Sequence, residues 1–431
     1  MLTQIDIKDF KSYRSEALHL SFLTLMIGAN ASGKSNAIEA FRLLSWLAQG
    51  QKLDVLKHQV QDSEQIVRGN IRDLGYLGTD KFTLGCTTDD HDWNQFEIEL
   101  HHRDDELHIS QEIITSPEEN WPLYRIEQPS GGLTNAIRVA YNNFKRGGKK
   151  PQITCTDQIA VLNQLASSAL FEAGHNRAKT TIPEVTNRFS RLLGNTLFLD
   201  PVPSLMRDAS YPEKRLKSDC SNLSGVLFNL SQSSNTNAAV IDFIRSLPEQ
   251  DVSTFDFQES LRGAKLLELV ENFGGNRRRW TADLLSDGTL RVLAIATALL
   301  SAQQGSTVII EEVDNGVHPS RAKQLLATML KHAQQRKVHL LLSTHNPALM
   351  DALPDAALDH VVFCYRDKNS GDSRLIRLSD LNDYPGLLSQ GPLGELVTHG
   401  IVDRFVKSPI SPQIKRKNAM DWLATLQGPD Q

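Results

Sequence analysis

The chain has 431 residues, of which 40% are hydrophobic and 23% are charged, and its formal net charge is −5 at pH 7. This composition is typical of a soluble globular protein with two or three structural units. The negative charge excludes a uniformly basic surface that coats nucleic acid. The apolar runs are far shorter than the ~20 residues of a membrane helix, and the N-terminus lacks the pattern of a secretory signal. No membrane is therefore expected among the partners of the chain.

The cysteines are few and widely separated. They stand at Cys86, Cys155, Cys220 and Cys364, and their spacing matches no metal-ligand motif. Free thiols in a reducing compartment are therefore expected. Together with the N-terminal sequence, this predicts a cytoplasmic location.

The first third of the chain predicts strands around one early helix. Apolar and polar residues alternate in Thr3–Ile7, and Leu18–Ile27 is apolar enough for a buried strand that runs into Gly28. Residues 82–126 alternate in the manner of an antiparallel meander. A helix is expected between these parts because apolar residues recur at helical spacing: Ile38, Phe41, Leu44 and Leu47.

The middle third predicts mainly helices. Asp157 is expected to cap one helix, and Thr236 and Pro248 to bracket another. Gly131–Pro151 is rich in Gly, Asn and Lys and predicts a loop. Residues 264–280 predict a hairpin that turns at Gly274-Gly275-Asn276.

The last third returns to an alternation of strands and helices. Thr307–Ile310 and Val338–Leu342 predict buried strands, and Arg321–Gln335 predicts the helix between them. Parallel strands separated by helices suit this alternation, so the expected fold class is α/β. The final residues, 381–431, contain helical fragments and several prolines, and no role is assigned to them.

One segment fits the pattern G-x-x-x-x-G-K-[ST] of a phosphate-binding loop. Its glycines let the backbone wind so that successive N–H groups point at phosphates, and the following helix presents its positive end to the same anion. Lys34 is expected to reach the β- and γ-phosphates of ATP, and the Ser35 hydroxyl to bind Mg²⁺. The predicted strand before it and helix after it argue against a chance match. The nucleotide-binding residues are Gly28, Ala29, Asn30, Ala31, Ser32, Gly33, Lys34, Ser35 and Asn36.

Two carboxylates stand at the exit of the strand Thr307–Ile310. Glu311 is expected to hold Mg²⁺ with Ser35, and Glu312 to orient or deprotonate the attacking water. Carboxylates also end strands simply because the chain leaves the core there. Many P-loop enzymes have Asp at the first position, so the Glu311 side chain is expected to hold the metal slightly differently.

Two further motifs flank the acidic strand. Ser286 and Gly288, in the sequence LSDGT, precede a strongly apolar helix, so they are expected at a second anion-binding helix end. The alternative is an ordinary serine cap. His345, in the sequence STHNP, follows the next strand and can contact a γ-phosphate or hold the attacking water. The alternative for His345 is a capping or core histidine.

Taken together, these motifs resemble the RecF/SMC branch of the ABC-type ATPases. The matching segments are Asp9–Tyr13, the GKSN ending at Asn36, LSDGT, EEVDNGVHP at 311–319 with Val313 in place of the family's proline, and Ser343–Pro347. The resemblance implies an ABC-type P-loop ATPase with a mixed sheet, an antiparallel β subdomain and an inserted helical lobe.

The resemblance also implies how the chain is divided. Residues 1–130 and 301–380 would form the nucleotide-binding lobe, and 131–300 a mainly helical insert that ends in the signature. Residues 381–431 would form a C-terminal tail. The family's glutamine-loop residue is left open between Gln59, Gln61 and Gln65.

The same resemblance implies that the active site needs two copies. Ser286 and Gly288 of one copy would close over ATP held by Lys34 of the other, in a homodimer or higher even oligomer. Glu312 and His345 would be the catalytic residues, with ATP and Mg²⁺ bound. Two helix ends facing one triphosphate bind it better than one, so ATP would join the copies.

The chain lacks the heptads of an SMC coiled coil and a recognisable Toprim nuclease. It is most similar to stand-alone ATPases that act beside a separate effector in phage defence, of the Septu, retron-associated or PARIS kind. The implied function is a nucleotide-driven dimeric switch that regulates a separate effector such as a nuclease. The alternative is a DNA-repair-type, ATP-dependent DNA clamp. DNA is a further candidate partner, and Arg277–Arg279 beside Trp280 is the best candidate contact, although such basic runs are usually solvated faces.

Overall fold

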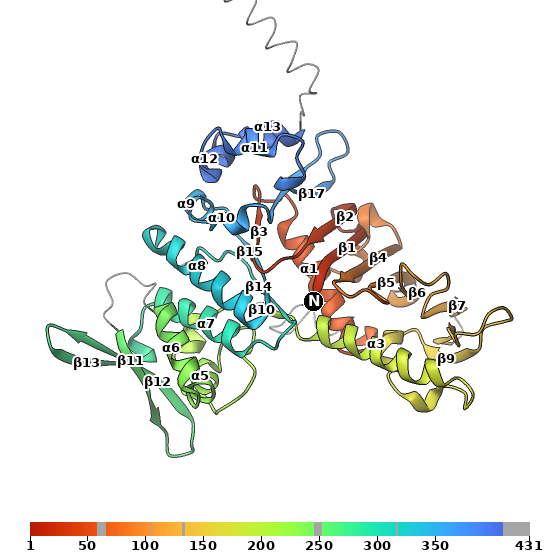
Figure 1. Cartoon of the computed structure of the whole chain (residues 1–431), viewed down its shortest axis with the longest axis horizontal. Helices are drawn as coiled ribbons and strands as arrows, with labels where there is room; N and C mark the ends of the chain where they lie inside the picture. Colours follow the sequence, from red (N-terminus) through yellow and green to blue (C-terminus); the bar gives the residue numbers. More distant parts are fainter. Residues whose placement is uncertain (58–65, 104, 132–133, 245–251, 316–317, 408–431) are drawn as a thin grey trace, which may run out of the picture.

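The computed structural model describes residues 1–431 except 58–65, 104, 132–133, 245–251, 316–317 and 408–431. Figure 1 shows a central group of strands with an antiparallel β lobe on one side and a lobe of helices and a small sheet on the other. The C-terminal helices lie at the third corner. No helix in the described residues is long and apolar enough to cross a membrane.

The antiparallel lobe is built on an eight-stranded sheet in which β1 and β2 form one edge. Neighbouring strands pair antiparallel throughout, for example Ile5 with Leu18 and Leu84 with Ile98. In sheet order, the strands are β2 (Tyr13–His19), β1 (Leu2–Phe10), β4 (Lys81–Thr88), β5 (Gln95–Arg103), β6 (Glu106–Thr115), β7 (Tyr124–Gln128), β8 (Ala136–Tyr141) and β9 (Gln152–Thr156).

The central sheet has six strands and positions the site. Its first five strands are parallel and the last is antiparallel, so the carboxyl ends of β3, β14, β15 and β16 lie at one edge. In sheet order, they are β10 (Leu197–Leu199), β14 (Thr307–Ile310), β15 (His339–Ser343), β3 (Thr24–Ile27), β16 (Val361–Arg366) and β17 (Ser373–Arg377).

Alternate residues of the central strands pack into two different cores. Met26, Ile309 and Leu341 face the core that contains α1 (Lys34–Ala48) and the antiparallel sheet. Leu25, Val308 and Leu340 face the core formed by the helical lobe and the C-terminal helices. The continuous apolar runs of these strands follow from this arrangement, because a parallel sheet covered on both faces needs apolar side chains on both.

Two helices accompany α1 on the antiparallel side, namely α2 (Val161–Gln164) and α3 (Asn176–Gly194). The helices on the opposite side are α4 (Pro203–Met206), α5 (Leu223–Ser231), α6 (Ser234–Ile244), α7 (Asp287–Ser301), α8 (Pro319–Arg336), α9 (Pro347–Asp351), α10 (Asp355–Leu358), α11 (Tyr384–Leu388), α12 (Leu393–Thr398) and α13 (Ile401–Lys407). A three-stranded sheet completes that lobe with β11 (Val252–Glu259), β12 (Lys265–Phe273) and β13 (Asn276–Thr281).

Most of the predicted elements are confirmed. The meander, the hairpin at 264–280, the helix after the phosphate loop and the strand Thr307–Ile310 are all present. The expectation of one strand over Leu18–Ile27 is wrong. Leu18 belongs to β2 in the antiparallel sheet, and a turn in which the Ser21 amide donates to Thr24 Oγ1 at 2.9 Å separates it from β3.

The prediction for the segment after residue 130 is also wrong in part. β8 lies inside the expected loop, and β8 and β9 continue the antiparallel sheet, so a boundary at 130 would cut through one sheet. Asp157 caps no helix. It is buried beside His108, whose Nδ1 lies 2.9 Å from Asp157 Oδ2, because the sheet brings these two residues together.

Candidate nucleotide-binding site

The phosphate loop connects β3 to α1 at the carboxyl edge of the central sheet. Gly28 and Gly33 have φ angles of 145° and 117°, which favour glycine. A β-carbon at Gly28 would lie 2.1 Å from the carbonyl oxygen of Cys364, and one at Gly33 would lie 2.4 Å from Ser373 Oγ. Both glycines are therefore required by backbone shape and by close packing.

Lys34 is the first residue of α1 and turns back across the loop. Its ammonium donates to the carbonyl oxygens of Gly28 at 2.6 Å and Ala29 at 3.0 Å. Burial lowers the pKa of Lys34, while Cys364 and Glu312 act in the opposite direction. The loop thus encloses one positive charge beside a helix N-terminus, which is an arrangement suited to a polyphosphate.

The floor of the loop is formed by β2 and β16. The fully buried Tyr13 hydroxyl donates to the Gly33 carbonyl oxygen at 3.0 Å and lies 3.3 Å from Cys364 Sγ. The Cys364 thiol donates to the Ser32 carbonyl oxygen at 3.3 Å, and Asn36 Nδ2 donates to Ser12 Oγ at 2.8 Å. Ser12 and Tyr13 of the Asp9–Tyr13 motif therefore hold the loop from below.

Glu311 follows β14 and faces the start of α1. Ser35 Oγ donates to Glu311 Oε2 at 3.2 Å, and Arg42 Nη2 lies 3.8 Å from Glu311 Oε1. Desolvation raises the pKa of Glu311, and Arg42, Ser35 and Arg68 oppose this rise. A hydroxyl and a carboxylate side by side are oxygen ligands of the kind that Mg²⁺ uses when phosphates and water complete its shell. These two residues therefore fit the predicted metal site.

Glu312 has a left-handed backbone, with a φ of 48°, and its side chain is 55% exposed. Its amide donates to Ser343 Oγ at 3.1 Å, and Asn315 Nδ2 donates to its Oε2 at 2.9 Å. His345 Nδ1 lies 4.0 Å from Glu312 Oε1. The side chains of the two adjacent glutamates thus point in different directions. Glu311 faces the α1 helix, whereas Glu312 faces the histidine at the end of β15.

A cavity of about 280 Å³ opens beside the two glutamates. Its lining includes Arg42, Asp200 and Arg291, three charged residues that the sequence motifs did not reveal. A signal for Arg42 existed, because it follows Ser35 by seven residues and so lies on the same face of α1. Asp200 and Arg291 carry no such local signal.

The signature stands at the start of α7, in the other core. Ser286 is the N-cap, and its Oγ accepts from the Thr289 amide at 3.1 Å, while Gly288 lies in the first turn. Arg207 donates to the Leu285 carbonyl oxygen at 3.1 Å and to Asp287 Oδ1 at 2.8 Å. Within the described residues, no hydrogen bond or ion pair joins residues 286–288 to residues 28–36.

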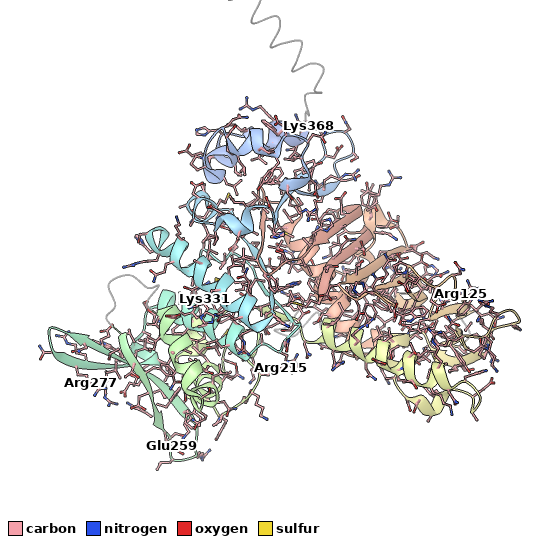
Figure 2. All side chains as sticks on the ribbon, viewed as in Figure 1. Arg125, Arg215, Glu259, Arg277, Lys331 and Lys368 are labelled. Atoms are coloured by element: carbon pink, nitrogen blue, oxygen red, sulfur yellow. The ribbon has the colours of Figure 1, made fainter. Side chains whose placement is uncertain are left out.

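The basic cluster on β13, Arg277–Arg279 with the adjacent Trp280, lies partly against carboxylates and is partly exposed. Arg279 Nη1 lies 2.7 Å from Glu268 Oε2 and 3.3 Å from Asp256 Oδ2, and Trp280 Nε1 donates to Glu271 at 2.7 Å. Arg277 lies exposed on the outer hairpin in Figure 2. Carboxylates therefore already hold Arg279 and the neighbouring Trp280, which weakens the expected DNA contact.

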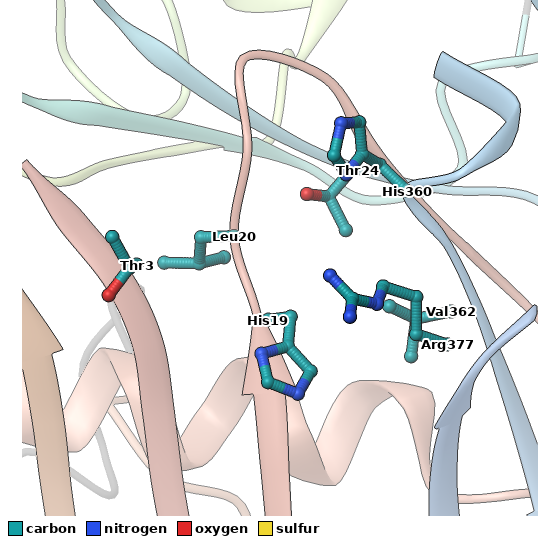
Figure 3. Close-up of a pocket in the computed structure, with 7 residues that line it drawn as sticks. All are labelled: Thr3, His19, Leu20, Thr24, His360, Val362 and Arg377. Carbon is teal, nitrogen blue, oxygen red and sulfur yellow. The ribbon is translucent and has the colours of Figure 1, made fainter. Parts of the chain in front are cut away.

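A second pocket, of about 190 Å³, lies at the opposite end of β3 (Figure 3). His19, His360 and Arg377 converge there, and Arg377 donates to Asp380 at 2.7 Å. Burial and Arg377 lower the pKa values of both histidines. The pocket thus contains the charged Arg377 and is separate from the phosphate loop. The three glutamines considered for the glutamine loop lie outside the described residues.

The phosphate loop, the paired glutamates after β14 and the signature helix in a separate lobe define an ATPase of the ABC type, similar to the RecF/SMC branch. The family model described as "AAA domain, putative AbiEii toxin, Type IV TA system" matches residues 121–351, more than half of the chain. The chain belongs to this family of AAA domains. A model described as "AAA ATPase domain" matches residues 1–121. No curated protein matches the chain in sequence.

Solved structures similar to the chain include heads of SMC proteins. An SMC head bound to the C-winged helix domain of ScpA is 11% identical, with a TM-score of 0.48, covering 87% of this chain and 96% of its own. The SMC head domain from Thermotoga maritima is 13% identical, with a TM-score of 0.37 and coverages of 87% and 98%. An Smc head with an extended coiled coil, bound to a ScpA domain derived from Pyrococcus furiosus, is 10% identical, with a TM-score of 0.40 and coverages of 87% and 95%.

Proposed function

We propose that the chain hydrolyses ATP as a dimeric switch that regulates a separate effector protein, such as a nuclease, in phage defence. The observation that carries the proposal is that, in the described part of the chain, no hydrogen bond or ion pair joins the signature to the phosphate loop of the same copy. The phosphate loop packs with the antiparallel lobe, whereas the signature helix packs with the helical lobe. A second copy, turned so that its α7 N-terminus meets the loop, would complete each site.

Binding would use the groups around the loop. Lys34 would leave the carbonyl oxygens of Gly28 and Ala29 for the β- and γ-phosphates, and the loop amides would donate to the phosphate oxygens. Ser35 and Glu311 would hold Mg²⁺ between them. When bound, Mg²⁺ neutralises the charge that develops on the phosphates.

Hydrolysis would use the second carboxylate. Glu312 would take a proton from the attacking water while the water oxygen bonds to the γ-phosphorus. The bond between the γ-phosphorus and the β-phosphate oxygen would break at the same time. Its position beside His345 supports this role, since the two side chains are 4.0 Å apart and both are about half exposed. His345 would hold the water or the γ-phosphate from the other side.

The surface around the signature suits a second copy. Leu205, in α4, is 43% exposed, and Leu284, which shortly precedes α7, is 63% exposed. Arg207 bridges these two segments through its hydrogen bonds to Leu285 and Asp287. Apolar side chains beside an anion-binding helix end would be covered when that end meets the nucleotide of the partner copy.

The separate effector is supported by two considerations. The motifs resemble those of stand-alone ATPases in defence operons. A switch needs a partner that distinguishes its two states. The ATP-bound dimer and the free chain would provide those states.

The mass of the chain in solution tests the switch. We expect the Glu312→Gln variant to sediment as a monomer without nucleotide and as a dimer with Mg²⁺–ATP, because bound ATP would join two copies and this variant would not consume it. Sedimentation velocity over a range of concentrations measures this. The same mass with and without ATP would contradict an ATP-driven switch.

A further inference from the structure

The pocket at the start of β3 gathers three side chains that can carry positive charge. His19 ends β2, His360 directly precedes β16, and Arg377 ends β17. Figure 3 shows these side chains around one space of about 190 Å³, with the Arg377 guanidinium between the two imidazole rings in this view. The fold thus brings together basic groups from three segments that are distant in the sequence.

These basic groups keep part of their hydrogen-bonding capacity. Arg377 Nε and Nη2 donate to Asp380 Oδ1 at 3.1 Å and 2.7 Å, and no described residue accepts from Nη1. Within the described part of the chain, the rings of His19 and His360 make no hydrogen bond to another residue. A protonated imidazole has two N–H donors, so the pocket can offer several donors to one ligand.

The other walls of the pocket limit the size and kind of that ligand. Leu20 and Val362 are buried apolar residues, and Thr24 Oγ1 already accepts from the Ser21 amide at 2.9 Å. The volume of about 190 Å³ is smaller than the roughly 300–1,000 Å³ of pockets that hold drug-sized molecules. A small, negatively charged ligand therefore fits this lining best.

We propose that this pocket binds a small tetrahedral oxyanion, such as inorganic phosphate or sulfate, between His19, His360 and Arg377. Arg377 would donate through Nη1, and each protonated ring would donate one N–H, which makes all of these hydrogen bonds charge-assisted. The anion would connect β2 of the antiparallel sheet with β16 and β17 of the central sheet. This site is independent of the proposed ATP site, because Thr24 begins β3 and Gly28 follows its other end.

The charges around the pocket predict how binding depends on pH. Burial and the Arg377 guanidinium lower the pKa values of both rings. Three carboxylates oppose this effect, namely Asp380 and Asp6 for His19 and Asp359 for His360. Burial lowers the pKa of His339, which interacts with His360, to about 4, so that ring stays neutral. An anion binds the protonated rings better than the neutral rings, so its affinity should rise as the pH falls.

Calorimetric titration with sulfate tests the site, because sulfate remains fully ionised over the pH range used. We expect the affinity of the wild type to rise about tenfold or more from about pH 8 to about pH 5, since a shift of one unit in the pKa of one ring corresponds to tenfold in affinity. A sulfate affinity that does not change with pH would overturn the proposal.

Two variants assign the pH dependence to the rings. His19→Gln and His360→Gln each keep a polar side chain but cannot become charged, so each should weaken sulfate binding about tenfold at about pH 5 and have little effect at about pH 8. A merely structural role would weaken binding equally at both pH values. The matched control is His91→Gln, because His91 is exposed between β4 and β5. Wild-type affinity in both ring variants at about pH 5 would overturn the assignment.

A Lys34→Ala chain separates this pocket from the phosphate loop, which can also attract an oxyanion. The pH-dependent binding of sulfate should persist in that variant, and its loss would place the ion in the phosphate loop and overturn the proposal. Inorganic phosphate should displace sulfate at least about tenfold better than AMP, because the pocket is too small for a nucleoside. Equal displacement by AMP would contradict a site for a free ion.

Discussion

The Glu312→Gln variant should hydrolyse ATP roughly 10²–10⁴ times more slowly than the wild type while still binding ATP, because the amide keeps the shape of the side chain and loses the base. In the structure, Asn315 donates to this carboxylate, and Ser343 accepts from the backbone amide of Glu312. Glutamine can still accept the hydrogen bond from Asn315, so the fold should be unaffected. Steady-state phosphate release and calorimetry measure the two effects separately.

Glu311→Gln is the matched comparison. It changes the neighbouring carboxylate, which faces Ser35 and Arg42, and should act through the metal. Its activity should therefore depend more steeply on Mg²⁺ concentration than that of the wild type. If Glu311→Gln lost turnover at every Mg²⁺ concentration while Glu312→Gln stayed active, the two roles would be reversed.

The Lys34→Ala variant should lose tight ATP binding, with affinity at least about a hundredfold lower, because hydrogen-bonded charge contacts to two phosphates disappear together. The fold should survive, since the ammonium contacts only the carbonyl oxygens of its own loop. Calorimetry with Mg²⁺–ATP measures the affinity, and thermal unfolding checks the fold. Lys52→Ala, at an exposed lysine beyond α1, is the control.

Unchanged ATP affinity in the Lys34→Ala variant would contradict the assignment of the phosphate loop as the nucleotide-binding site. The variant has a second use, because it would hold the chain in the free state, whereas Glu312→Gln would hold it in the ATP-bound state. A separate effector that responds to the switch should therefore respond oppositely to the two variants.

The sequence predicted the parts of the fold that depend on local pattern. The phosphate loop, the strand before Glu311 and the cap at Ser286 follow from short-range rules about glycines, apolar runs and helix ends, and the structure has these elements at those positions. The class of ATPase follows from the same motifs and is confirmed. The roles given to Glu312, His345 and Ser286 stay predictions.

The predictions from sequence were wrong where contacts between distant segments determine the local structure. Polar, glycine-rich surroundings predicted a loop at β8, yet the meander offers it an edge to pair with. Aspartate commonly caps helices, but Asp157 pairs instead with a histidine 49 residues away in the sequence. Asp200 and Arg291 were missed for the same reason, because only the fold brings them to the cavity beside Glu311 and Glu312.

We propose that Ser286 completes the nucleotide site of another copy, and the turnover of the Ser286→Arg variant tests this role. In the structure, Ser286 caps its own helix and makes no hydrogen bond to the phosphate loop of its own copy in the described part of the chain. An arginine there would put a bulky cation where a small hydroxyl must approach the γ-phosphate of the partner copy.

We predict that Ser286→Arg binds ATP with near wild-type affinity, through Lys34 of each copy, and has almost no ATP turnover. Retained binding shows that the variant is folded, and Ser286→Ala, which removes the cap at a cost of about 1 kcal/mol, separates loss of the cap from loss of the site. Turnover is measured as phosphate release across a wide range of protein concentrations. Wild-type turnover by Ser286→Arg at all of these concentrations would contradict the composite site and the dimeric mechanism with it.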